Sequence, residues 1–450
     1  MKQRAAIILA AGMGTRMKSA LPKVLHPVGG RPVIDWSIAL AKSLGCDPVI
    51  CVVSPDVEAV SARVNEVLGG GAIAEQSPAL GTGHAVSCAE KALAGFKGDV
   101  VVLYADSPLI PKEAIEDLFS VLGEGASVGV LGFEAVEPGL YGRLVTDKSG
   151  ALEAIVEARD ATPDQLEVTL CNSGVMACDS ETLFGLLKRV TNENAKGEYY
   201  LTDIVGLARG DGLSCGAVTC AEEDLIGCDK REDLAAAEAT FQAKARAALL
   251  EKGVSLIAPE TVFLSFDTEI ANDVTIEPNV VFAPGVKVES GARIRAFSHL
   301  EGAHISPYCE VGPYARLRPG AVLQAKAKIG NFVEVKKTTV GEGAKANHLA
   351  YLGDGEIGAG VNIGAGTIFC NYDGYFKHKT EIGAGAFIGS NSALVAPVKI
   401  GEGAMVGSGS IVTQDVGADA LALARAKQIE KTGWAAKFRE IMSFRKNNKG

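Results

Sequence analysis

The sequence has no long apolar stretch, no excess of positive charge and no closely paired cysteines. No run reaches the roughly 18 apolar residues of a membrane-spanning helix, so we do not expect a membrane protein. The 44 Lys and Arg residues face 54 Asp and Glu, and no basic stripe is visible, which argues against nucleic acid as a partner. The 10 cysteines form no C-x-x-C pair and have no histidines at zinc spacing. This usage argues against structural zinc and is typical of reduced thiols in a cytoplasm.

The N-terminal half alternates between short β-branched runs and helical patterns as far as about residue 228. We expect strands at 6–10, 49–54 and 100–104, and helices at 33–44 and 87–93. The alternation predicts a mostly parallel sheet covered by helices, an α/β fold that binds ligands at the carboxyl ends of its strands. The first run follows two basic residues, as a signal peptide would, but the glycines and charges directly after it favour a buried strand.

Residues 229–253 predict one long helix between two differently patterned halves. The segment is rich in Ala, Glu, Lys and Leu and has no glycine or proline before it stops at Gly253. The chain is therefore divided into an N-terminal domain at 1–228, a helical linker at 229–253 and a C-terminal domain at 254–450.

The C-terminal domain follows a six-residue repeat. The whole chain has 53 glycines in 450 residues, about 12% against a usual share of about 7%, and such an excess is typical of a repeat with tight turns. Seventeen aliphatic or aromatic positions recur in phase, in three runs. A hexapeptide period predicts a parallel β-helix in which stacked coils bury this ladder. The positions are Ile276, Phe282, Val288, Ile294, Leu300, Ile305, Val311, Leu317, Leu323, Ile329, Val335, Ile382, Ile388, Leu394, Ile400, Val406 and Val412.

Two interruptions of the repeat are expected to form loops on this scaffold, at 335–357 and 363–382. The first contains His348, and the second contains Asn371, Tyr372 and Lys377. Beyond Val416 the repeat is expected to end, leaving a tail that forms a helix along the coils or a mobile terminus.

A glycine-containing loop, LAAGMGTRM at 9–17, directly follows the first expected strand. Its glycines allow backbone N–H groups to approach phosphate oxygens, and Arg16 and Lys23 can offset the charge of a triphosphate. The third glycine of a dinucleotide site and the G-K-[ST] of a P-loop are both missing, which argues against those two sites.

More motifs follow this loop in order. They are Gln76, G-T-G-H at 81–84, Y-A-D at 104–106, Y-G-R at 141–143, I-V-E at 155–157, N-S-G at 172–174, G-E-Y-Y-L-T-D at 197–203 and G-C-D at 227–229. In these motifs the N-terminal half closely resembles the sugar-1-phosphate nucleotidyltransferases. With the hexads added, nearly the whole chain resembles the bifunctional N-acetylglucosamine-1-phosphate uridyltransferase/glucosamine-1-phosphate N-acetyltransferase family. The resemblance implies a Rossmann-like nucleotidyltransferase domain, a connecting helix and a left-handed parallel β-helix, assembled as a homotrimer with acetyl sites shared between chains.

For the first domain the resemblance implies attack of a sugar phosphate on the α-phosphorus of UTP, with release of pyrophosphate. A phosphate monoester is largely dianionic near neutral pH, its second pKa being about 6, so the nucleophile needs no general base. Arg16 and Lys23 are the expected catalytic cations, and Asp106 and Asp229 the expected ligands of Mg²⁺. Asp229 stands where the family usually has Asn, and Ala105 where it usually has Gly. The residues matching the family's nucleotide and sugar contacts are Leu9, Ala10, Ala11, Gly12, Lys23, Gln76, Gly81, Thr82, Tyr104, Ala105, Asp106, Gly142, Glu157, Asn172 and Asp229.

For the second domain the resemblance implies acetyl transfer from acetyl-CoA to glucosamine 1-phosphate. An amine must lose a proton to attack a thioester, and a histidine with a pKa near 6.5 suits that task. In the family's pattern His348 is this base, whereas His84 is expected at a helix start. Sugar contacts are matched by Arg318, Lys336, Tyr351 and Asn362, with Asn371 orienting the sugar or acyl group. Acetyl-CoA contacts are matched by Ala365, Asn371, Tyr372, Lys377, Ser390, Ser408 and Arg425.

Two alternatives remain open at this point. The chain could be a nucleotidyltransferase with one activity, whose repeats regulate or assemble it, or it could be a ligand-binding scaffold without chemistry. The hexads alone do not separate these possibilities. His348, Lys336 and Arg425 favour two activities over one, and Arg16, Lys23 and Asp106 favour an enzyme over a scaffold.

Overall fold

The computed structural model describes residues 2–147 and 150–448, which form two compact units. The first unit extends to Ala248 and also includes Leu264–Phe266. The second unit contains Leu249–Phe263 and the chain from Asp267 onward. The change of unit falls near the end of α8 (Arg231–Glu251), which is the long helix that the composition predicts.

The first unit is built on a mixed sheet with strand order β11-β7-β10-β6-β1-β4-β5. Strands β6, β1, β4 and β5 pair in parallel, whereas β10 is antiparallel to both β6 and β7. The mostly parallel α/β fold is thus confirmed. The strands are β1 (Gln3–Ala10), β4 (Val49–Val53), β5 (Ile73–Glu75), β6 (Gly98–Tyr104), β7 (Val128–Glu134), β8 (Arg143–Thr146), β9 (Leu152–Val156), β10 (Leu170–Asp179) and β11 (Cys215–Thr219), with a separate pair β2 (Pro27–Val28) and β3 (Arg31–Pro32).

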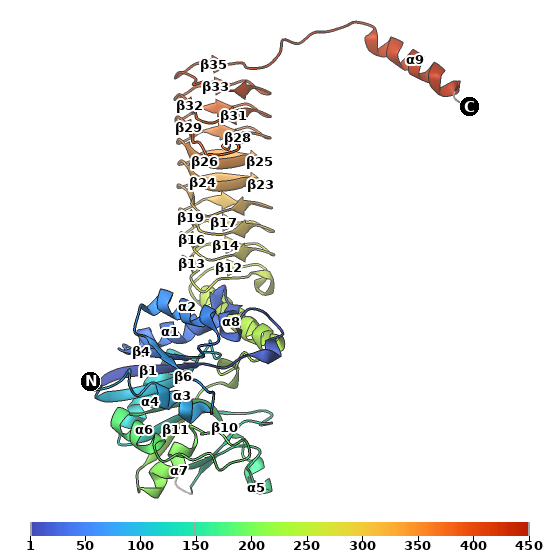
Figure 1. The fold of residues 1–450 in the computed structure, drawn as a ribbon. Coiled ribbons are helices and arrows are strands. Elements are labelled where there is room, and N and C mark those ends of the chain that lie inside the picture. Colours follow the sequence, from blue (N-terminus) through green and yellow to red (C-terminus); the bar gives the residue numbers. More distant parts are fainter. Residues whose placement is uncertain (1, 148–149, 449–450) are drawn as a thin grey trace. The chain divides into compact units, whose positions relative to one another are not determined.

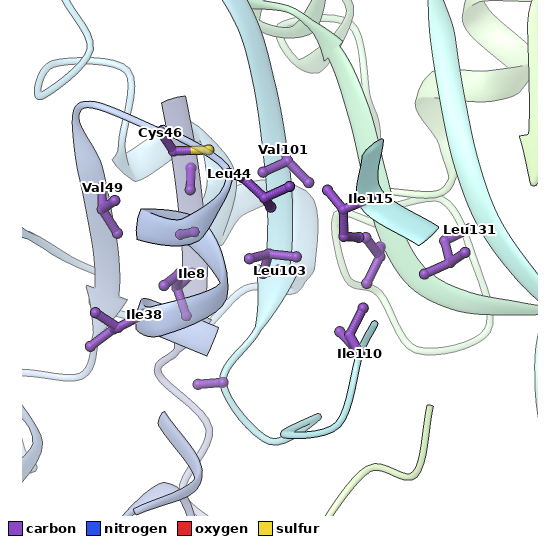
Figure 2. Packing of buried hydrophobic residues seen from close by; sticks show 14 of the residues in the cluster. Ile8, Ile38, Leu44, Cys46, Val49, Val101, Leu103, Ile110, Ile115 and Leu131 are labelled. Carbon is purple, nitrogen blue, oxygen red and sulfur yellow. The ribbon is translucent and has the colours of Figure 1, made fainter. Parts of the chain in front are cut away.

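Helices enclose this sheet so that its central strands bury both faces. Successive residues of β1 point to opposite sides, and Ile7 and Ile8 accordingly belong to two separate buried clusters. In the cluster of Ile8, side chains from α1 and β6 such as Ile38 and Leu103 pack together (Figure 2). The helices are α1 (Val33–Ser43), α2 (Glu58–Leu68), α3 (Thr82–Cys88), α4 (Lys112–Gly123), α5 (Pro163–Leu166), α6 (Ser180–Leu187) and α7 (Asp203–Gly210).

The helix expected at 87–93 is wrong in its position. Helix α3 starts at Thr82 and ends at Cys88, and hydrogen-bonded turns follow, such as that from Leu93 N to Ala89 O at 3.1 Å. The apolar spacing that suggested a longer helix is real, since Ala89 and Leu93 are buried. Those turns bury them without continuing the helix.

The second unit is a stack of short parallel strands whose ladders are visible in Figure 1. One ladder has the order β12-β14-β17-β20-β23-β25-β27-β30-β33-β35, and its pairs join hexad positions such as Ile276 to Ile294 and Ile294 to Val311. All seventeen residues of the expected ladder are buried, none more than 4% exposed. The hexapeptide β-helix is therefore confirmed.

The strands of this unit are β12 (Ser255–Leu256), β13 (Glu269–Ile270), β14 (Thr275–Ile276), β15 (Val281–Phe282), β16 (Lys287–Val288), β17 (Arg293–Ile294), β18 (His299–Leu300), β19 (Ala303–Ile305), β20 (Glu310–Val311), β21 (Arg316–Leu317), β22 (Ala321–Leu323), β23 (Lys328–Asn331), β24 (Glu334–Val340), β25 (Lys345–His348), β26 (Tyr351–Ile357), β27 (Asn362–Ile363), β28 (Ile368–Cys370), β29 (Thr380–Ile382), β30 (Phe387–Ile388), β31 (Ala393–Val395), β32 (Val398–Ile400), β33 (Met405–Val406), β34 (Ile411–Val412) and β35 (Leu421–Ala422).

The first interruption of the repeat is not a loop, contrary to expectation. Strands β24 and β26 lengthen to seven residues each, and His348 ends β25, which pairs with β23 and β27. The additional residues are absorbed by longer paired strands rather than by a loop. The second interruption does contain a loop, closed by an antiparallel bridge between Tyr372 and Lys377.

The coils continue beyond Val416, because β35 still pairs with β33. A last helix, α9 (Trp434–Asn447), follows, and all of its side chains are exposed, so it does not pack along the coils. In the described part of the chain, no helix is both long enough and apolar enough to cross a membrane. Seven of the ten cysteines are buried, and burial raises the pKa of Cys46 to about 11, as expected for thiols used as small apolar side chains.

Candidate active sites

The glycine-containing loop after β1 brings Lys23 to the sheet edge. Gly14 has a φ of 59°, a left-handed conformation that glycine adopts without strain. A Cβ at this position would lie 2.5 Å from the Cβ of Lys23, so the loop can approach Lys23 only with glycine there. Lys23 follows in a short 3-10 turn, and its side chain is only 10% exposed.

A cavity of about 280 Å³ lies between this loop and the ends of β1 and β6. Ten of the expected nucleotide-site residues line it, together with Glu198. Its position at the carboxyl ends of parallel strands agrees with the prediction from the strand pattern. The ten residues are Leu9, Ala10, Ala11, Gly12, Lys23, Gln76, Gly81, Thr82, Tyr104 and Asp106.

Four charged groups form a cluster, of which Lys23 and Asp106 line this cavity. The ammonium of Lys23 lies 2.5 Å from Asp106 Oδ2 and 2.8 Å from Asp229 Oδ1, and Arg16 Nη2 lies 2.7 Å from Asp229 Oδ2. Burial alone would lower the pKa of Lys23, but the two carboxylates raise it above its ordinary value. Lys23 is therefore a permanent cation held between two carboxylates that come from distant parts of the sequence.

A second cavity, of about 840 Å³, shares Tyr104 and Asp106 with the first and adds Arg16, Asn172 and Asp229. Gly142 and Glu157 lie close by, because a Cβ on Gly142 would be 3.5 Å from Glu157 Oε1 and 3.7 Å from Asn172 Cβ. Burial raises the pKa of the Glu157 carboxyl. The structure thus gathers the expected residues of the first site around two adjoining cavities.

Ala105, like Gly142 and Glu157, lines neither cavity, and its side chain is fully buried. Its backbone N donates to Leu9 O at 3.0 Å. Sequence reasoning did not single out Glu198, although the motif at 197–203 contains it, nor the contact at 3.2 Å between Gln76 Nε2 and His84 Nδ1. The motifs gave the order of these residues but not their contacts.

In the second unit, three cationic side chains gather: Arg318 directly after β21, Lys336 on β24 and Lys377 in the loop between β28 and β29. Leu317 pairs with Val335, which places Arg318 and Lys336 at matching positions of adjacent coils, as their 18-residue spacing predicts. Contact with Lys377 lowers the pKa of Lys336, and the positive charge of Arg318 lowers it further. Such a cluster of cations favours binding of an anion, because the anion relieves the repulsion between them.

Polar groups surround this cationic cluster. Asn371 Nδ2 donates to Asp354 Oδ2 and approaches Tyr351 Oη at 3.5 Å, and Arg318 donates to Glu334 Oε1 at 2.7 Å. Asp354 and Glu334 were not among the expected site residues. The spacing of the hexads does contain a signal for Glu334, which pairs with Arg316 across one coil.

His348 lies in a different set of contacts. Its Nδ1 is 2.8 Å from Asn331 Oδ1, on the neighbouring strand, and both residues line a cavity of about 350 Å³. Since a carbonyl oxygen only accepts hydrogen bonds, Nδ1 carries the proton and Nε2 remains free to accept one. Within residues 2–147 and 150–448, no hydrogen bond or ion pair joins the His348 ring to Arg318, Lys336 or Tyr351.

The expected acyl-donor residues continue the line of His348 along one ladder. Ala346 pairs with Ile363, Ile363 with Ile388, and Ile388 with Val406. His348, Ala365, Ser390 and Ser408 each lie two residues after one of these paired positions, so they follow one another along the ladder. Arg425 follows at the end of the line, where its Nη1 donates to Ser408 O at 2.6 Å.

Asn362 lies on the same ladder as His348, on β27, whereas Asn371, Tyr372 and Lys377 belong to the loop near the cationic cluster. The expected residues of the second site therefore divide into two groups within one chain. One group holds His348 and the acyl-donor line, and the other holds the cations.

Two family models match separate parts of the chain. Residues 6–167 match the family model for a MobA-like NTP transferase domain. Residues 267–302 and 379–414 match the model for the bacterial transferase hexapeptide (six repeats).

Similar proteins cover almost the entire chain. A bifunctional protein GlmU from Hyphomonas neptunium is 65% identical over 438 residues, or 97% of this chain and 95% of that protein. The GlmU of Caulobacter vibrioides is 55% identical over 448 residues, covering 100% of this chain and 97% of that protein. The GlmU of Paramagnetospirillum magneticum is 53% identical over 447 residues, covering 99% and 98%. The resemblance predicted from the motifs is confirmed, and the chain belongs to the family of bifunctional GlmU proteins.

Proposed function

We propose that this chain makes UDP-N-acetylglucosamine in two steps. It transfers an acetyl group from acetyl-CoA to glucosamine 1-phosphate, and then a uridylyl group from UTP to the N-acetylated product, releasing pyrophosphate. The observation that carries the proposal is the presence of two separate constellations, one in each unit: carboxylates and cations around a cavity at the sheet edge, and a histidine in line with the acyl-donor positions.

In the first unit we assign charge neutralisation and alignment to Lys23 and Arg16. A dianionic sugar phosphate is already a competent nucleophile, so the unit needs to hold it in line with the α-phosphorus and to offset the charge on the phosphates. Lys23 lines the first cavity and Arg16 the second, both contact Asp229, and both carry charge of the required sign. The residues that divide between the two adjoining cavities would hold the nucleotide and the sugar.

Asp106 and Asp229 suit a divalent cation, because both already approach one cation, the ammonium of Lys23. Among the described residues no group of three or more His, Cys, Asp or Glu side chains could hold a metal. Two carboxylates completed by phosphate oxygens and water are the ligand set that Mg²⁺ usually takes. When bound there, Mg²⁺ would supply positive charge that orients the phosphates.

In the second unit we assign the general base to His348 Nε2. Its Nδ1 donates to Asn331, which leaves Nε2 as the ring nitrogen that can accept a proton. The amine of glucosamine 1-phosphate attacks the thioester carbonyl, its proton passes to Nε2, and the CoA thiolate leaves and is protonated. Arg318 and Lys336 would hold the sugar phosphate, and Ala365, Ser390, Ser408 and Arg425 would hold the acyl carrier.

A homotrimer is part of the proposal, because among the described residues no hydrogen bond or ion pair joins the His348 ring to the cationic cluster. A neighbouring copy that places its cationic cluster beside His348 would complete an acetyl site. A left-handed β-helix and a cytoplasmic location, as implied by the family resemblance and the reduced cysteines, complete the description. Reactions are assigned to 1–228 and 254–450, with 229–253 as linker.

The proposed function is tested with the purified chain, glucosamine 1-phosphate, acetyl-CoA, UTP and Mg²⁺. Free thiol and pyrophosphate are followed separately, and each reaction is also started from its own substrates. We expect thiol release without UTP, and pyrophosphate release when N-acetylglucosamine 1-phosphate is supplied directly. Pyrophosphate release without any thiol release would favour the one-activity alternative.

A further inference from the structure

Gln76 and His84 form a polar contact in the first cavity that phosphate chemistry does not explain. Gln76 follows β5, lines the cavity and is only 6% exposed. Its Nε2 lies 3.0 Å from the carbonyl oxygen of Gly81 and 3.2 Å from Nδ1 of His84. His84 belongs to α3, and its Nε2 is 3.9 Å from the Cys88 sulfur, one helical turn later.

These two contacts fix which end of the Gln76 amide faces which neighbour. The Gly81 carbonyl can only accept a hydrogen bond, so the Gln76 group beside it must be the NH₂. That NH₂ has a second hydrogen, and His84 Nδ1 is placed to accept it. A flipped amide would bring its oxygen against the Gly81 oxygen and the lone pair of His84 Nδ1, which is unfavourable at both contacts.

The carbonyl end of Gln76 is therefore the end that remains for a ligand. In the described part of the chain, Gln76 Oε1 has no hydrogen-bond donor, and it is not among the fully buried side-chain atoms that lack a partner. Because Gln76 lines the cavity, this oxygen presents an acceptor to whatever occupies it.

An acceptor at this position distinguishes between pyrimidine bases. Uracil carries an N–H at N3 that can donate to the Gln76 oxygen, whereas N3 of cytosine is itself an acceptor and would be repelled. We propose that His84 is a positioning residue that locks the Gln76 amide, so that its carbonyl oxygen selects UTP over CTP. This inference rests on the proposed uridylyl transfer, in which Gln76 is already an expected nucleotide contact, and what it adds is the role of His84 in orienting that amide.

The ring of His84 is suited to this role rather than to proton transfer. Both of its nitrogens already face protein groups, Nδ1 facing Gln76 and Nε2 facing Cys88. A leucine at position 84 would remove the acceptor and leave one of the two restraints on the amide. An asparagine would keep an acceptor, since its side-chain oxygen reaches nearly the place of Nδ1, but it would lose the contact with Cys88.

The experiment compares His84→Leu with His84→Asn in the full-length chain. Both variants lose the Cys88 contact, so a difference between them isolates the acceptor that faces Gln76. For each protein, kcat and KM are measured with UTP and with CTP, using N-acetylglucosamine 1-phosphate and Mg²⁺ and following pyrophosphate. We expect His84→Leu to raise KM for UTP with little change in kcat, and to lower the preference for UTP over CTP about fivefold, the effect of one neutral hydrogen bond. His84→Asn should keep the preference of the unmodified chain.

Three outcomes overturn the inference. The first is an unchanged UTP preference in a folded His84→Leu protein, and the second is an equal loss of preference in both variants. If His84→Leu fails to fold, His84→Ala, which adds no bulk, replaces it; failure of both to fold would assign His84 a structural role only. These results differ from a failure of the proposed function, in which the unmodified chain would release no pyrophosphate from UTP.

Discussion

Removing the ammonium of Lys23 tests whether the charges at the first cavity depend on one another. Lys23→Met keeps most of the aliphatic stem but leaves Asp106 and Asp229 without the cation that lies 2.5 and 2.8 Å from them. Arg16 still contacts Asp229, so Asp106 loses the most. Two neighbouring carboxylates would then repel each other at the edge of the cavity.

The loss of stability in Lys23→Met depends on how deeply the ion pairs are buried. Breaking a fully buried ion pair by removing one partner costs about 3–5 kcal/mol, and an exposed pair is worth about 0–1 kcal/mol. The Lys23 side chain is 10% exposed, whereas Asp106 and Asp229 are 21% and 36% exposed. We therefore expect Lys23→Met to lower the unfolding free energy by about 2 kcal/mol, a value between those for exposed and fully buried pairs. In a unit of this size, that loss lowers Tm by about 4–8 °C.

The sign of the pH dependence also follows. The pKa of Lys23 is raised above its ordinary value of 10.5. The stabilisation that its charge gives to the folded state is therefore fully present at neutral pH, and it is lost only as the pH rises above 10.5 and through the raised pKa. The difference in Tm between Lys23→Met and the unmodified chain should therefore stay constant between pH 6 and about pH 9.

Scanning calorimetry of four proteins measures this coupling. The proteins are the unmodified chain, Lys23→Met, Asp229→Asn and the double variant, with Lys18→Met as a control because Lys18 is an exposed lysine of the same loop. We expect the double variant to be more stable than the sum of the single effects, since it removes one of the two repelling charges. Uridylyl transfer should fall in Lys23→Met while acetyl transfer remains. An unchanged Tm, or strictly additive effects, would refute the reasoning.

Two further predictions concern the second unit. A Cβ on Gly330 would lie 2.0 Å from Asn347 O of the next coil, so Gly330→Ala should lower the unfolding free energy by about 3 kcal/mol, the upper end of the usual cost of overpacking a core. Gly343→Ala, where φ is 65° but no atom lies within 4 Å, should cost only about 1–2 kcal/mol; equal losses in denaturant unfolding would contradict the steric argument. Asp373 accepts hydrogen bonds from His378 and from two backbone amides, which lower the pKa of its carboxyl to about 2. The stabilisation that its carboxylate gives to the folded state is therefore present above about pH 4 and is lost as the pH falls towards 2. Hydrogen exchange of those amides, corrected for intrinsic rates, should lose protection over that interval, and constant protection would argue against the contacts.

Most of the fold could be predicted because burial imposes periods on the sequence. The ladder from Ile276 to Val412 required only a constant spacing of apolar residues, and the structure buries every member. The position of His348 could not be obtained in the same way. Counting residues shows that a coil has extra length, but not whether that length forms a loop or, as in β24 and β26, longer paired strands.

The candidate sites show a similar limit. The motifs identified Lys23, Asp106 and Asp229, and the strand pattern indicated the edge of the sheet at which they would meet. Their mutual contacts depend on side-chain geometry that no spacing encodes, as does the hydrogen bond between Asn331 and His348. Residue counting does indicate that Lys336 and His348 occupy different ladders, because they are 12 residues apart rather than the 18 that separate Arg318 from Lys336.

The central claim is that two independent chemistries reside in the two units. The most direct measurement assays His348→Ala and Asp106→Ala for both thiol release from acetyl-CoA and pyrophosphate release from UTP. We predict that His348→Ala lowers acetyl transfer by about 10²–10⁴-fold, the usual contribution of a general base, while uridylyl transfer stays close to that of the unmodified chain, and that Asp106→Ala gives the opposite pattern. Parallel loss of both activities in either variant, with Tm preserved, would contradict the account.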